Sequence, residues 1–499
     1  GRMSFVDSCI RFSSPSRGTG APVAFTTNRS LFLKNVWIFG ASYVAKFENG
    51  ALNSGKMGWT NVVVFARGEN SSAYASHPEW VLQSPTYIDG RRYETGKAIL
   101  NTVKHGAAVV PPQGLVSQHS WGPANEFPSF TSKHVRNVRK APYNAVGDGL
   151  TDDTTAIQRA LDDAANAVKT SLTPLGAGSC QIVLLPRGQY AIKRTLQVKN
   201  GVALIGVAKH LSRLVMFFDD RLFYRNANDE IQAMVETDTD AAFTLLAFFS
   251  TTVWNTAPSV AAIRWQAKGG LVRGIHFNRA NRCGSYDGHG CKLPTPINHP
   301  MMSITGKNAS LKFFTFFSED CCRTETFSDP STFWKGYLAG PQEAHYRHLL
   351  VTNGAGPVQF YHLNCEHGTG EAICEFSNGA HDIDIFGFKA EGNTVALWIR
   401  DCDNIKSFGS GGCGCVENKT VWPPSFEQDA PSFYRIQRST NILLANVMDQ
   451  GSQRTKPEGN PFNEVGCNPN AENKILAEAK GEQILTDVFD RPVAFIVNG

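Results

Sequence analysis

The chain has 499 residues, 42% of them hydrophobic, which suits two domains or one elongated domain and argues against a largely disordered protein. Its 48 basic and 44 acidic residues give a formal net charge of +4 without any basic run, so we expect no nucleic acid partner. No apolar run approaches the roughly 18 residues that cross a bilayer, so we expect no membrane span.

The first two segments of the chain differ in composition. Residues 1–66 contain short runs in which apolar and polar residues alternate between Asn and Gly turns, as in "APVAFTTNRSLFLKNVWIFGASYVAKF". This pattern predicts short strands that form coils of a β-helix, the remnant of a first β-helix lobe. Residues 67–135 are richer in Ser, Pro, Gly and aromatic residues, which predicts an irregular connector. An uncapped coil would expose strand edges, so we expect an N-terminal lobe or a separate partner chain to complete the first β-helix.

An acidic motif, "VGDGLTDDTTAIQRALDDA", spans Val146 to Ala164. Apolar residues recur within it at helical spacing, and Asp152, Asp153 and Thr154 precede them, where oxygens can accept from the free N–H groups of a helix start. We therefore assign these aspartates to the scaffold rather than to catalysis. Two strand-like runs follow, "QIVLLPRGQYAI" and "TLQVKNGVALIGV". A helix before stacked strands is typical of the end cap of a solenoid.

Residues 371–412 contain a gapless repeat, in which "NGAHDIDIFGF" aligns with "RDCDNIKSFGS", and a third copy, "RSTNILLANV", follows at 438–447 after a longer loop. Each copy holds short runs of period two, which is typical of strands, and only a stack of such coils can bury its inner face. We therefore expect an all-β fold, in which residues 136–499 form a right-handed single-stranded parallel β-helix with a short capping helix. A propeller, the alternative, would need blades of about 40 residues. The matched positions are Ile383 with Ile405, Phe386 with Phe408, and Gly387 with Gly409.

The twelve cysteines bear on location and on metal binding. The stretch "CGSYDGHGC" is a glycine-rich loop that a disulfide between Cys283 and Cys291 could close, and a zinc site there would need more ligands than His289 offers. We favour the disulfide and, with it, a secreted protein. The nearest metal-like spacing elsewhere is "HYRH" with His345 and His348, which fits a surface strand pair, so we expect no metal and no cofactor.

Three segments, "YNAVGDGLTDDTTAIQRAL", "IVLLPRGQYAI" and "GVALIGV", together resemble the opening of the pectate-lyase-like superfamily of right-handed parallel β-helices. That superfamily includes hydrolases, lyases, epimerases and phage tailspikes, so the resemblance implies a fold and leaves the reaction open. The order of coils, a connector with "SWGPANEF" and then "VRNVRKAPYNAVGDGLTDD" is similar to glycoside hydrolase family 55. Members of that family are exo-β-1,3-glucanases built from two tandem β-helices, and the resemblance extends loosely over residues 20–450.

The same resemblance implies the catalytic residues. The stretch "LNCEHGTGEAICEFSNGAHDIDIFGFKAEGN" looks like the family's approach to its general acid, which places that acid on Glu391 in "FGFKAEG". The family is inverting, and an inverting enzyme needs a second carboxylate about 6.5–9.5 Å away to activate water. Glu371 precedes Glu391 by nearly the length of one coil of the repeat, so stacking would make the two neighbours across coils. We expect the other acids to face solvent, namely Asp382, Asp384, Asp401 and Asp403.

Sugar rings stack their C–H faces on aromatic side chains and hydrogen-bond to polar ones. Phe386 and Phe408 hold matched repeat positions, so we assign them to a stacked core. The candidate substrate-binding residues are Tyr361, His367, Glu375 and Trp398.

We therefore expect a secreted enzyme that hydrolyses β-1,3-glucan from chain ends, with a polysaccharide as its substrate. Two alternatives stay open. A polysaccharide lyase on this fold would need a basic residue to take the C5 proton of a uronate, and the acidic run at 366–403 argues against that substrate. A non-catalytic glycan-binding or structural β-helix is the other alternative, and the abrupt start within coil-like sequence keeps it open.

Overall fold

The computed structural model describes residues 2–12, 21–54, 58–74, 77–106, 108–119, 135–168, 179–216, 232–254, 260–280, 300–320, 346–368, 371–392, 395–414, 432–447, 474–487 and 490–499. At some strand ends it describes the backbone without the side chains, namely at 72–74, 77–80, 254, 260, 279–280, 319–320, 366–368, 391–392, 412–414 and 474. No helix within these segments is long and apolar enough to cross a membrane.

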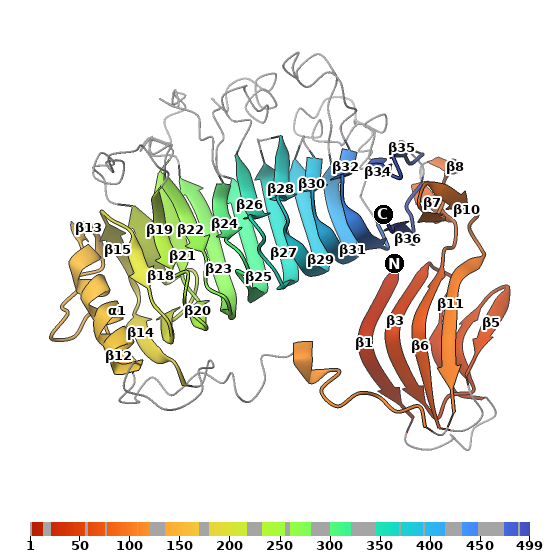
Figure 1. The fold of residues 1–499 in the computed structure, drawn as a ribbon, viewed down its shortest axis with the longest axis horizontal. Helices are drawn as coiled ribbons and strands as arrows, with labels where there is room; N and C mark the ends of the chain where they lie inside the picture. Colours follow the sequence, from red (N-terminus) through yellow and green to blue (C-terminus); the bar gives the residue numbers. More distant parts are fainter. Residues whose placement is uncertain are drawn as a thin grey trace, which may run out of the picture.

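Most of the described strands stack as coils along the long axis of the molecule (Figure 1). From β14 on, each early coil gives one strand to each of three faces. The first face holds β12 (Val135–Asn137), β14 (Gln181–Leu185), β17 (Val202–Gly206) and β20 (Thr244–Ala247). The second face holds β13 (Asp148–Asp152), β15 (Gly188–Ile192), β18 (Ser212–Met216) and β21 (Ser250–Trp254).

In the later coils one long strand spans the first and second faces. These strands are β23 (Gly270–Ala280), β25 (Leu311–Asp320), β27 (Val358–Gly368), β29 (His381–Gly392) and β31 (Asp403–Gly414), followed by the shorter β33 (Thr440–Ala445). The third face holds β16 (Leu196–Val198), β19 (Gln232–Thr237), β22 (Val260–Trp265), β24 (Pro300–Thr305), β26 (Arg347–Thr352), β28 (Ala372–Phe376), β30 (Val395–Arg400), β32 (Ser432–Gln437) and β34 (Lys474–Ala479). Neighbouring coils pair in parallel, so the predicted parallel β-helix is confirmed.

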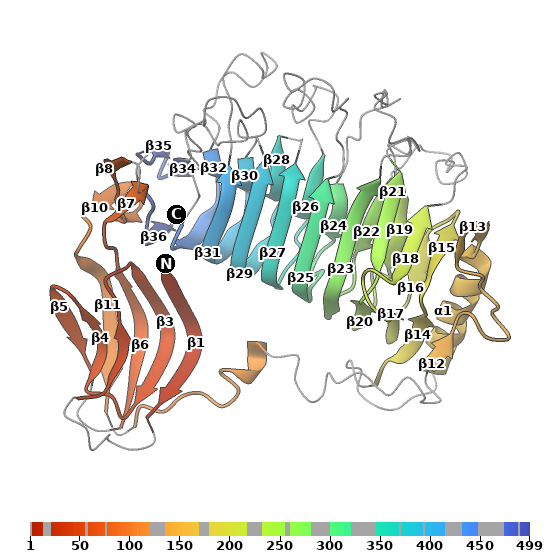
Figure 2. The same ribbon diagram turned by 180° about the vertical axis from the view of Figure 1, so that it is seen from behind.

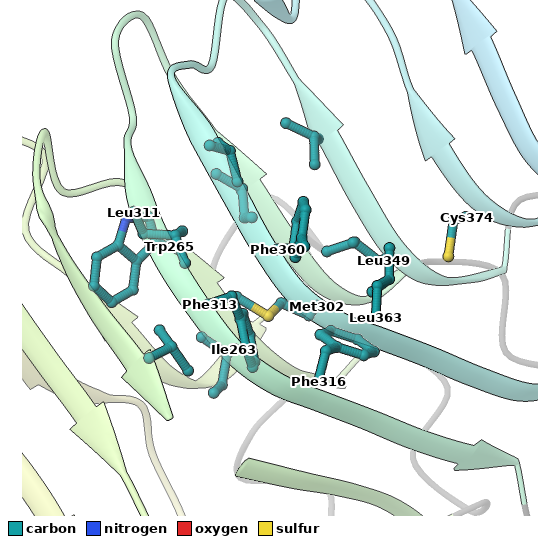
Figure 3. Packing of buried hydrophobic residues seen from close by; sticks show 14 of the residues in the cluster. Ile263, Trp265, Met302, Leu311, Phe313, Phe316, Leu349, Phe360, Leu363 and Cys374 are labelled. Carbon is teal, nitrogen blue, oxygen red and sulfur yellow. The ribbon is translucent and has the colours of Figure 1, made fainter. Parts of the chain in front are cut away.

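The core lies inside the coils because alternate strand residues point inward. Phe313 on β25 pairs in register with Phe360 on β27, and their rings stack with centroids 6.1 Å apart. Figure 3 shows these rings beside Met302 and Leu349, which come from the third face. The indole N–H of buried Trp265 donates to two backbone carbonyls at 3.1 Å, so even the polar atom of this large side chain is satisfied.

The predicted repeat corresponds to strand register. Ile383, Ile405 and Ile442 face one another across β29, β31 and β33. Gly387 and Gly409 both have a left-handed backbone, with φ of 82° and 83°, at the bend between the first and second faces. Such a bend favours glycine because a side chain is strained at positive φ.

Phe386 and Phe408 stack on each other in an apolar core, as predicted, but this core is not the one inside the coils. The two rings stack 5.4 Å apart, as expected, but they belong to a separate apolar cluster on the outside of the coils. That cluster includes Phe32 and Ala66 from the N-terminal sheet. A match between coils fixes the register of two residues but does not tell which side of the strand they occupy.

The helix α1 (Thr154–Val168) covers the first coils (Figure 1). Ile157 N–H donates to the carbonyl of Asp153, and Asp152 Oδ1 accepts the N–H of Thr154 at 3.0 Å, so these residues form the helix start. The Asp153 carboxylate accepts the backbone N–H groups of Val146 and Gly147 at 2.7 and 2.9 Å, which fastens the preceding turn. The acidic motif is therefore scaffold. The buried residues of α1 are Thr154, Ile157, Ala160, Leu161, Ala164 and Ala165.

The N-terminal region differs from the expected β-helix coils. The strands β1 (Met3–Arg11), β3 (Leu31–Phe39), β6 (Trp59–Arg67) and β11 (Ala98–His105) form one sheet, in which β3–β6 and β6–β11 pair antiparallel. A second sheet holds β2 (Val23–Thr26), β4 (Tyr43–Phe47) and β5 (Gly50–Asn53). Coils of a parallel β-helix pair only in parallel. Period-two alternation predicts a half-buried strand, but it does not give the direction of the partner strand.

The expected irregular connector, 67–135, also contains paired strands. They are β7 (Ser71–Tyr74), β8 (His77–Leu82), β9 (Thr86–Ile88) and β10 (Arg91–Tyr93), followed by β11 of the N-terminal sheet and then by the short helix η1 (Ser117–His119). β9 pairs with the last strand, β36 (Ala494–Val497), and β35 (Glu482–Leu485) pairs with β34. The carboxylate of buried Asp490 accepts from the Tyr87 hydroxyl at 2.5 Å and from Arg92 Nε at 2.8 Å. These contacts close the C-terminal end of the β-helix.

The N-terminal sheet itself also contacts this end, where both chain termini lie (Figures 1 and 2). Asn446, which follows β33, donates from Nδ2 to the carbonyl of Met3 at 2.6 Å, and Arg2 donates to the carbonyl of Val447 at 3.0 Å. The first strand of the chain is thus joined to the last coils of the β-helix.

Candidate active site

The residue predicted as general acid, Glu391, is the last residue but one of β29, at the end where the strand leaves the second face. In the parallel register it stands opposite Glu366 on β27, and Glu366 stands opposite Glu319 on β25. We call these three residues the carboxylate row. Neighbouring strands lie about 4.8 Å apart, so one saccharide unit and its neighbours could span the three backbone positions of the row. The three side chains lie outside the described part of the structure.

The expected neighbour of Glu391, Glu371, is not its register partner. The register places Glu366 opposite Glu391, and it slips between Glu366 and Gly368. Glu371 was predicted because its distance from Glu391 along the sequence is close to the period of the repeat. In the structure the residue that faces Glu391 is further away along the sequence. Glu371 instead directly precedes β28, and its Oε2 lies 3.0 Å from Nη2 of Arg347 on β26.

Glu375 on β28 is the centre of a buried ion-pair network. It is only 4% exposed, and its two oxygens accept from Arg347 Nε and Arg400 Nε, both at 2.8 Å. Arg347 itself is 3% exposed. A buried carboxylate needs such partners, since an unpaired charge in this position would be very costly. Glu375, predicted to bind substrate, therefore holds two arginines in place, and one of these contacts Glu371.

Trp398 follows Glu375 in register on β30. Its indole N–H donates to Gln437 Oε1 at 2.9 Å, and the guanidinium carbons of Arg435 and Arg400 lie 4.8 and 4.9 Å from its ring centroid. Cations at these distances are attracted to the ring face. A sugar that stacks on Trp398, as predicted, would have to displace one of them.

Tyr361 on β27 is part of an aromatic stack on the outside of the first face. Phe314 and Phe386 lie on either side in register, with centroids 4.5 and 5.0 Å away and nearly parallel planes. The Tyr361 hydroxyl lies 3.0 Å from Nδ1 of His119, and burial raises its pKa well above the ordinary value. A sugar could therefore meet only the edge of this side chain and not its ring face.

Two further predictions fall on residues that the structure does not describe in full. His367 is on β27, and its side chain lies outside the described part, as do both residues of the predicted Cys283–Cys291 disulfide. Sequence reasoning missed Arg347, although it lies inside the "HYRH" stretch, and gave no role to Glu366. Within the described segments, no group of three or more His, Cys, Asp and Glu side chains could hold a metal ion.

Comparisons with known proteins concern one part of this β-helix. Residues 135–270 match the family model of rhamnogalacturonase A/epimerase, pectate lyase-like proteins. The match begins at β12, includes α1 and ends where β23 begins, so it covers well under half of the chain and stops before the carboxylate row. No curated protein sequence matches the chain.

Several solved structures are similar to the chain. The A-module of mannuronan C-5 epimerase AlgE4 from Azotobacter vinelandii is 10% identical, with a TM-score of 0.27 over 62% of this chain and 88% of that one. PfbA, a surface adhesin of Streptococcus pneumoniae, is 13% identical, with a TM-score of 0.35 over 64% and 80%. ORF18 of Geobacillus virus E2 is 13% identical, with a TM-score of 0.29 over 97% and 77%. At these values none of the three bears on the activity of this chain.

Proposed function

We propose that the protein is a polysaccharide-active enzyme that hydrolyses glycosidic bonds at the carboxylate row. The observation that carries the proposal is the register of Glu319, Glu366 and Glu391 on three neighbouring strands. Glycoside hydrolysis usually needs two carboxyl groups, one to protonate the leaving oxygen and one to act on the other side of the bond. The match of part of the chain to pectate-lyase-like proteins supports a carbohydrate substrate.

Glu391 acts as the general acid in this proposal, as the family resemblance implies, and Glu366 is the second carboxylate. Like charges on neighbouring carboxylates favour a state in which one of them keeps its proton, which is what a general acid needs. In an inverting reaction the two groups must be about 6.5–9.5 Å apart. Side chains that diverge from adjacent strands can reach this separation, because their backbones alone lie about 4.8 Å apart.

The substrate implied by the resemblance is β-1,3-glucan, cleaved from chain ends by a secreted enzyme. The ion-pair network on the third face gives the β-helix a rigid polar surface, since Arg347 joins Glu371 to buried Glu375. Rigid support of this kind positions the groups that meet a substrate.

One observation favours a second candidate, a lyase that acts on uronates. The guanidinium groups of Arg347, Arg400 and Arg435 gather around Trp398 on the third face. A lyase needs a cation to neutralise the uronate carboxylate while a base removes the C5 proton. Two of these arginines are already paired with Glu375, which weakens this candidate relative to hydrolysis.

The test is to incubate the protein with laminarin, polygalacturonate and alginate, and to measure both reducing sugar and the ultraviolet absorbance of unsaturated products. Glucose from laminarin that disappears in Glu391→Gln supports the proposal. Hydrolysis of an acidic polysaccharide keeps the hydrolase and rejects the β-1,3-glucan. Unsaturated products would reject the hydrolase in favour of the lyase. A folded protein that is inactive on all three polysaccharides would favour a non-catalytic β-helix. The matched control is Glu482→Gln, an exposed residue on β35.

A further inference from the structure

A second group of polar residues lies on the outside of the second face, away from the ion-pair network. Ser250 on β21 stands opposite His276 on β23, and His276 stands opposite Phe317 on β25. The flanking residues Ile275 and Phe277 are fully buried in the core, so His276 points to the outside of the coil. On the other side, Ser250 stands opposite Arg213 of β18.

The turn between β17 and β18 lies against this row. Its His210 ring is 5.6 Å from the His276 ring, edge to face, and its Lys209 Nζ lies 5.3 Å from the ring of Phe317. Phe317 in turn contacts His276, with ring centroids 4.8 Å apart. Basic residues from this turn and from β18 thus gather around one imidazole. We call them the basic cluster, which consists of Lys209, His210, Arg213 and His276.

His276 is buried without satisfying its polar atoms. It is 8% exposed, and neither of its ring nitrogens has a hydrogen-bond partner among the described residues. The hydroxyl of Ser250, its register neighbour, is also buried without such a partner. Buried polar atoms in native proteins are nearly always paired, because leaving a donor or acceptor unmet costs about 1–3 kcal/mol. An imidazole with two unmet nitrogens is therefore suited to receive a ligand.

The charge of the cluster indicates the kind of ligand. None of its four side chains makes an ion pair within the described segments, whereas Arg347, Arg400 and Arg264 elsewhere on the β-helix all pair with glutamates. The groups that face His276 are Lys209 and His210 from the turn, Arg213 from β18, Ser250 from β21 and Phe317 from β25. No carboxylate is among them. Among the described side chains, the site thus has N–H and O–H donors and positive charge but no anion.

We propose that the basic cluster binds an oxyanion, the carboxylate or sulfate group of an acidic saccharide. Arginine and lysine donate charge-assisted hydrogen bonds to such groups, and the imidazole and hydroxyl add neutral donors. The saccharide part of this proposal rests on the proposed hydrolysis of a polysaccharide and takes an acidic polysaccharide as the substrate in place of β-1,3-glucan, which carries no acidic group. The oxyanion part does not rest on the proposed function.

The position of the cluster supports a saccharide ligand. Asn278, two positions beyond His276 on β23, pairs in register with Glu319, the first member of the carboxylate row. From His276 the row member Glu391 lies three strands further on, about 15 Å across the coils at a strand spacing of about 4.8 Å. One chain could therefore place an acidic group in the cluster and a glycosidic bond a few sugar units away at the carboxylate row.

The experiment measures binding without turnover. The Glu391→Gln protein is titrated with oligogalacturonate, sulfated oligosaccharide, neutral laminari-oligosaccharide, sodium acetate and sodium sulfate. Binding is followed by calorimetry and by the NMR signals of the His276 imidazole. We expect at least one acidic oligosaccharide to bind and to raise the pKa of His276 by about one unit or more, since an anion favours the charged ring. Neutral oligosaccharide should leave the imidazole signals unchanged.

Two variants and a control make the result specific. Lys209→Ala/Arg213→Ala should weaken binding of the acidic oligosaccharide at least about tenfold, as loss of two charge-assisted contacts implies. His276→Phe is the second variant and keeps a ring that packs on Phe317. Lys268→Ala/Arg438→Ala removes the same charge elsewhere and should leave binding unchanged.

Each contrary outcome rejects a stated part of the proposal. Free acetate or sulfate that binds as tightly as the oligosaccharide would reject the saccharide and leave an oxyanion site. No response of His276 to any anion would reject the oxyanion site itself. Because binding is measured in an inactive variant, the result does not depend on whether Glu391 is catalytic.

Discussion

Nδ1 of His119 lies 3.0 Å from the hydroxyl of Tyr361, although the two residues are 242 positions apart. The other ring nitrogen of His119 lies 2.9 Å from Asp7 Oδ2 on β1. One imidazole thus connects the N-terminal sheet, the segment 108–119 and the β-helix. The ring also meets Tyr361 and Phe386 edge to face, so the contact is apolar as well as polar.

The first prediction concerns this contact. Tyr361→Phe keeps the stacked ring and removes the hydroxyl, so it should lower the free energy of unfolding by about 1 kcal/mol. His119→Ala should cost more because it also releases Asp7. In a double-mutant cycle by urea denaturation the two changes should couple by about 0.5 kcal/mol or more. Strict additivity would show that the His119–Tyr361 contact contributes nothing.

The second prediction concerns the buried network. Glu375→Gln leaves Arg347 and Arg400 without their shared carboxylate, and breaking a buried pair costs about 3–5 kcal/mol. The control is Asp401→Asn, which breaks an exposed pair with Arg438 and should cost less than about 1 kcal/mol. Urea denaturation of both variants measures the difference. Equal effects would contradict the central role of Glu375.

The third prediction compares two glycines with left-handed backbone. A methyl group at Gly147, with φ of 69°, would lie 2.9 Å from Cε1 of buried Tyr190, whereas one at Gly387, with φ of 82°, would meet no atom within 4 Å. Both Ala variants carry backbone strain of about 1–2 kcal/mol. Gly147→Ala should cost about 1–3 kcal/mol more, because the core beneath the cap must also shift. Thermal unfolding of the two variants checks this order, and a reversed order would contradict the packing described for the cap.

The fourth prediction is a pH dependence. Burial, with the nearby charges of Lys209, His210 and Arg213, lowers the pKa of His276 to about 4. An unfolded histidine has a pKa of about 6.5, so between these values the unfolded chain binds a proton that the folded chain does not. Stability should therefore fall as the pH drops from about 6.5 towards about 4. In His276→Phe this part of the pH dependence should be absent, while the exposed control His105→Gln should keep it. A full pH dependence in His276→Phe would contradict the assignment.

The sequence was sufficient for the β-helix because its signal is local and repeated. Ile383 and Ile405 match in the repeat because they occupy the same place in successive coils, and the start of α1 carries its own capping residues. The same reasoning failed for the N-terminal sheet. The alternation of β3 and β6 is the same whether strands pair in parallel or antiparallel, so it could not exclude the antiparallel sheet.

The candidate site was harder to predict because it depends on register and on distant contacts. β27 and β29 pair Val358 with Ile383 and, in the same register, Glu366 with Glu391, and no pattern in the sequence gives this offset between the two strands. The contact of His119 with Asp7 and Tyr361 joins segments that only the folded chain brings together. The acidic side chains were visible in the sequence, but their neighbours were not.

The most direct test of the proposed hydrolase compares three glutamine variants on whichever polysaccharide the wild-type protein cleaves. Because Glu366, and not Glu371, is the register partner of Glu391, kcat/KM should fall at least about 100-fold in both Glu391→Gln and Glu366→Gln. In Glu371→Gln it should fall less than about tenfold, provided that circular dichroism shows all three to be folded. Full activity in Glu391→Gln, or a loss in Glu371→Gln with none in Glu366→Gln, would contradict the proposed active site.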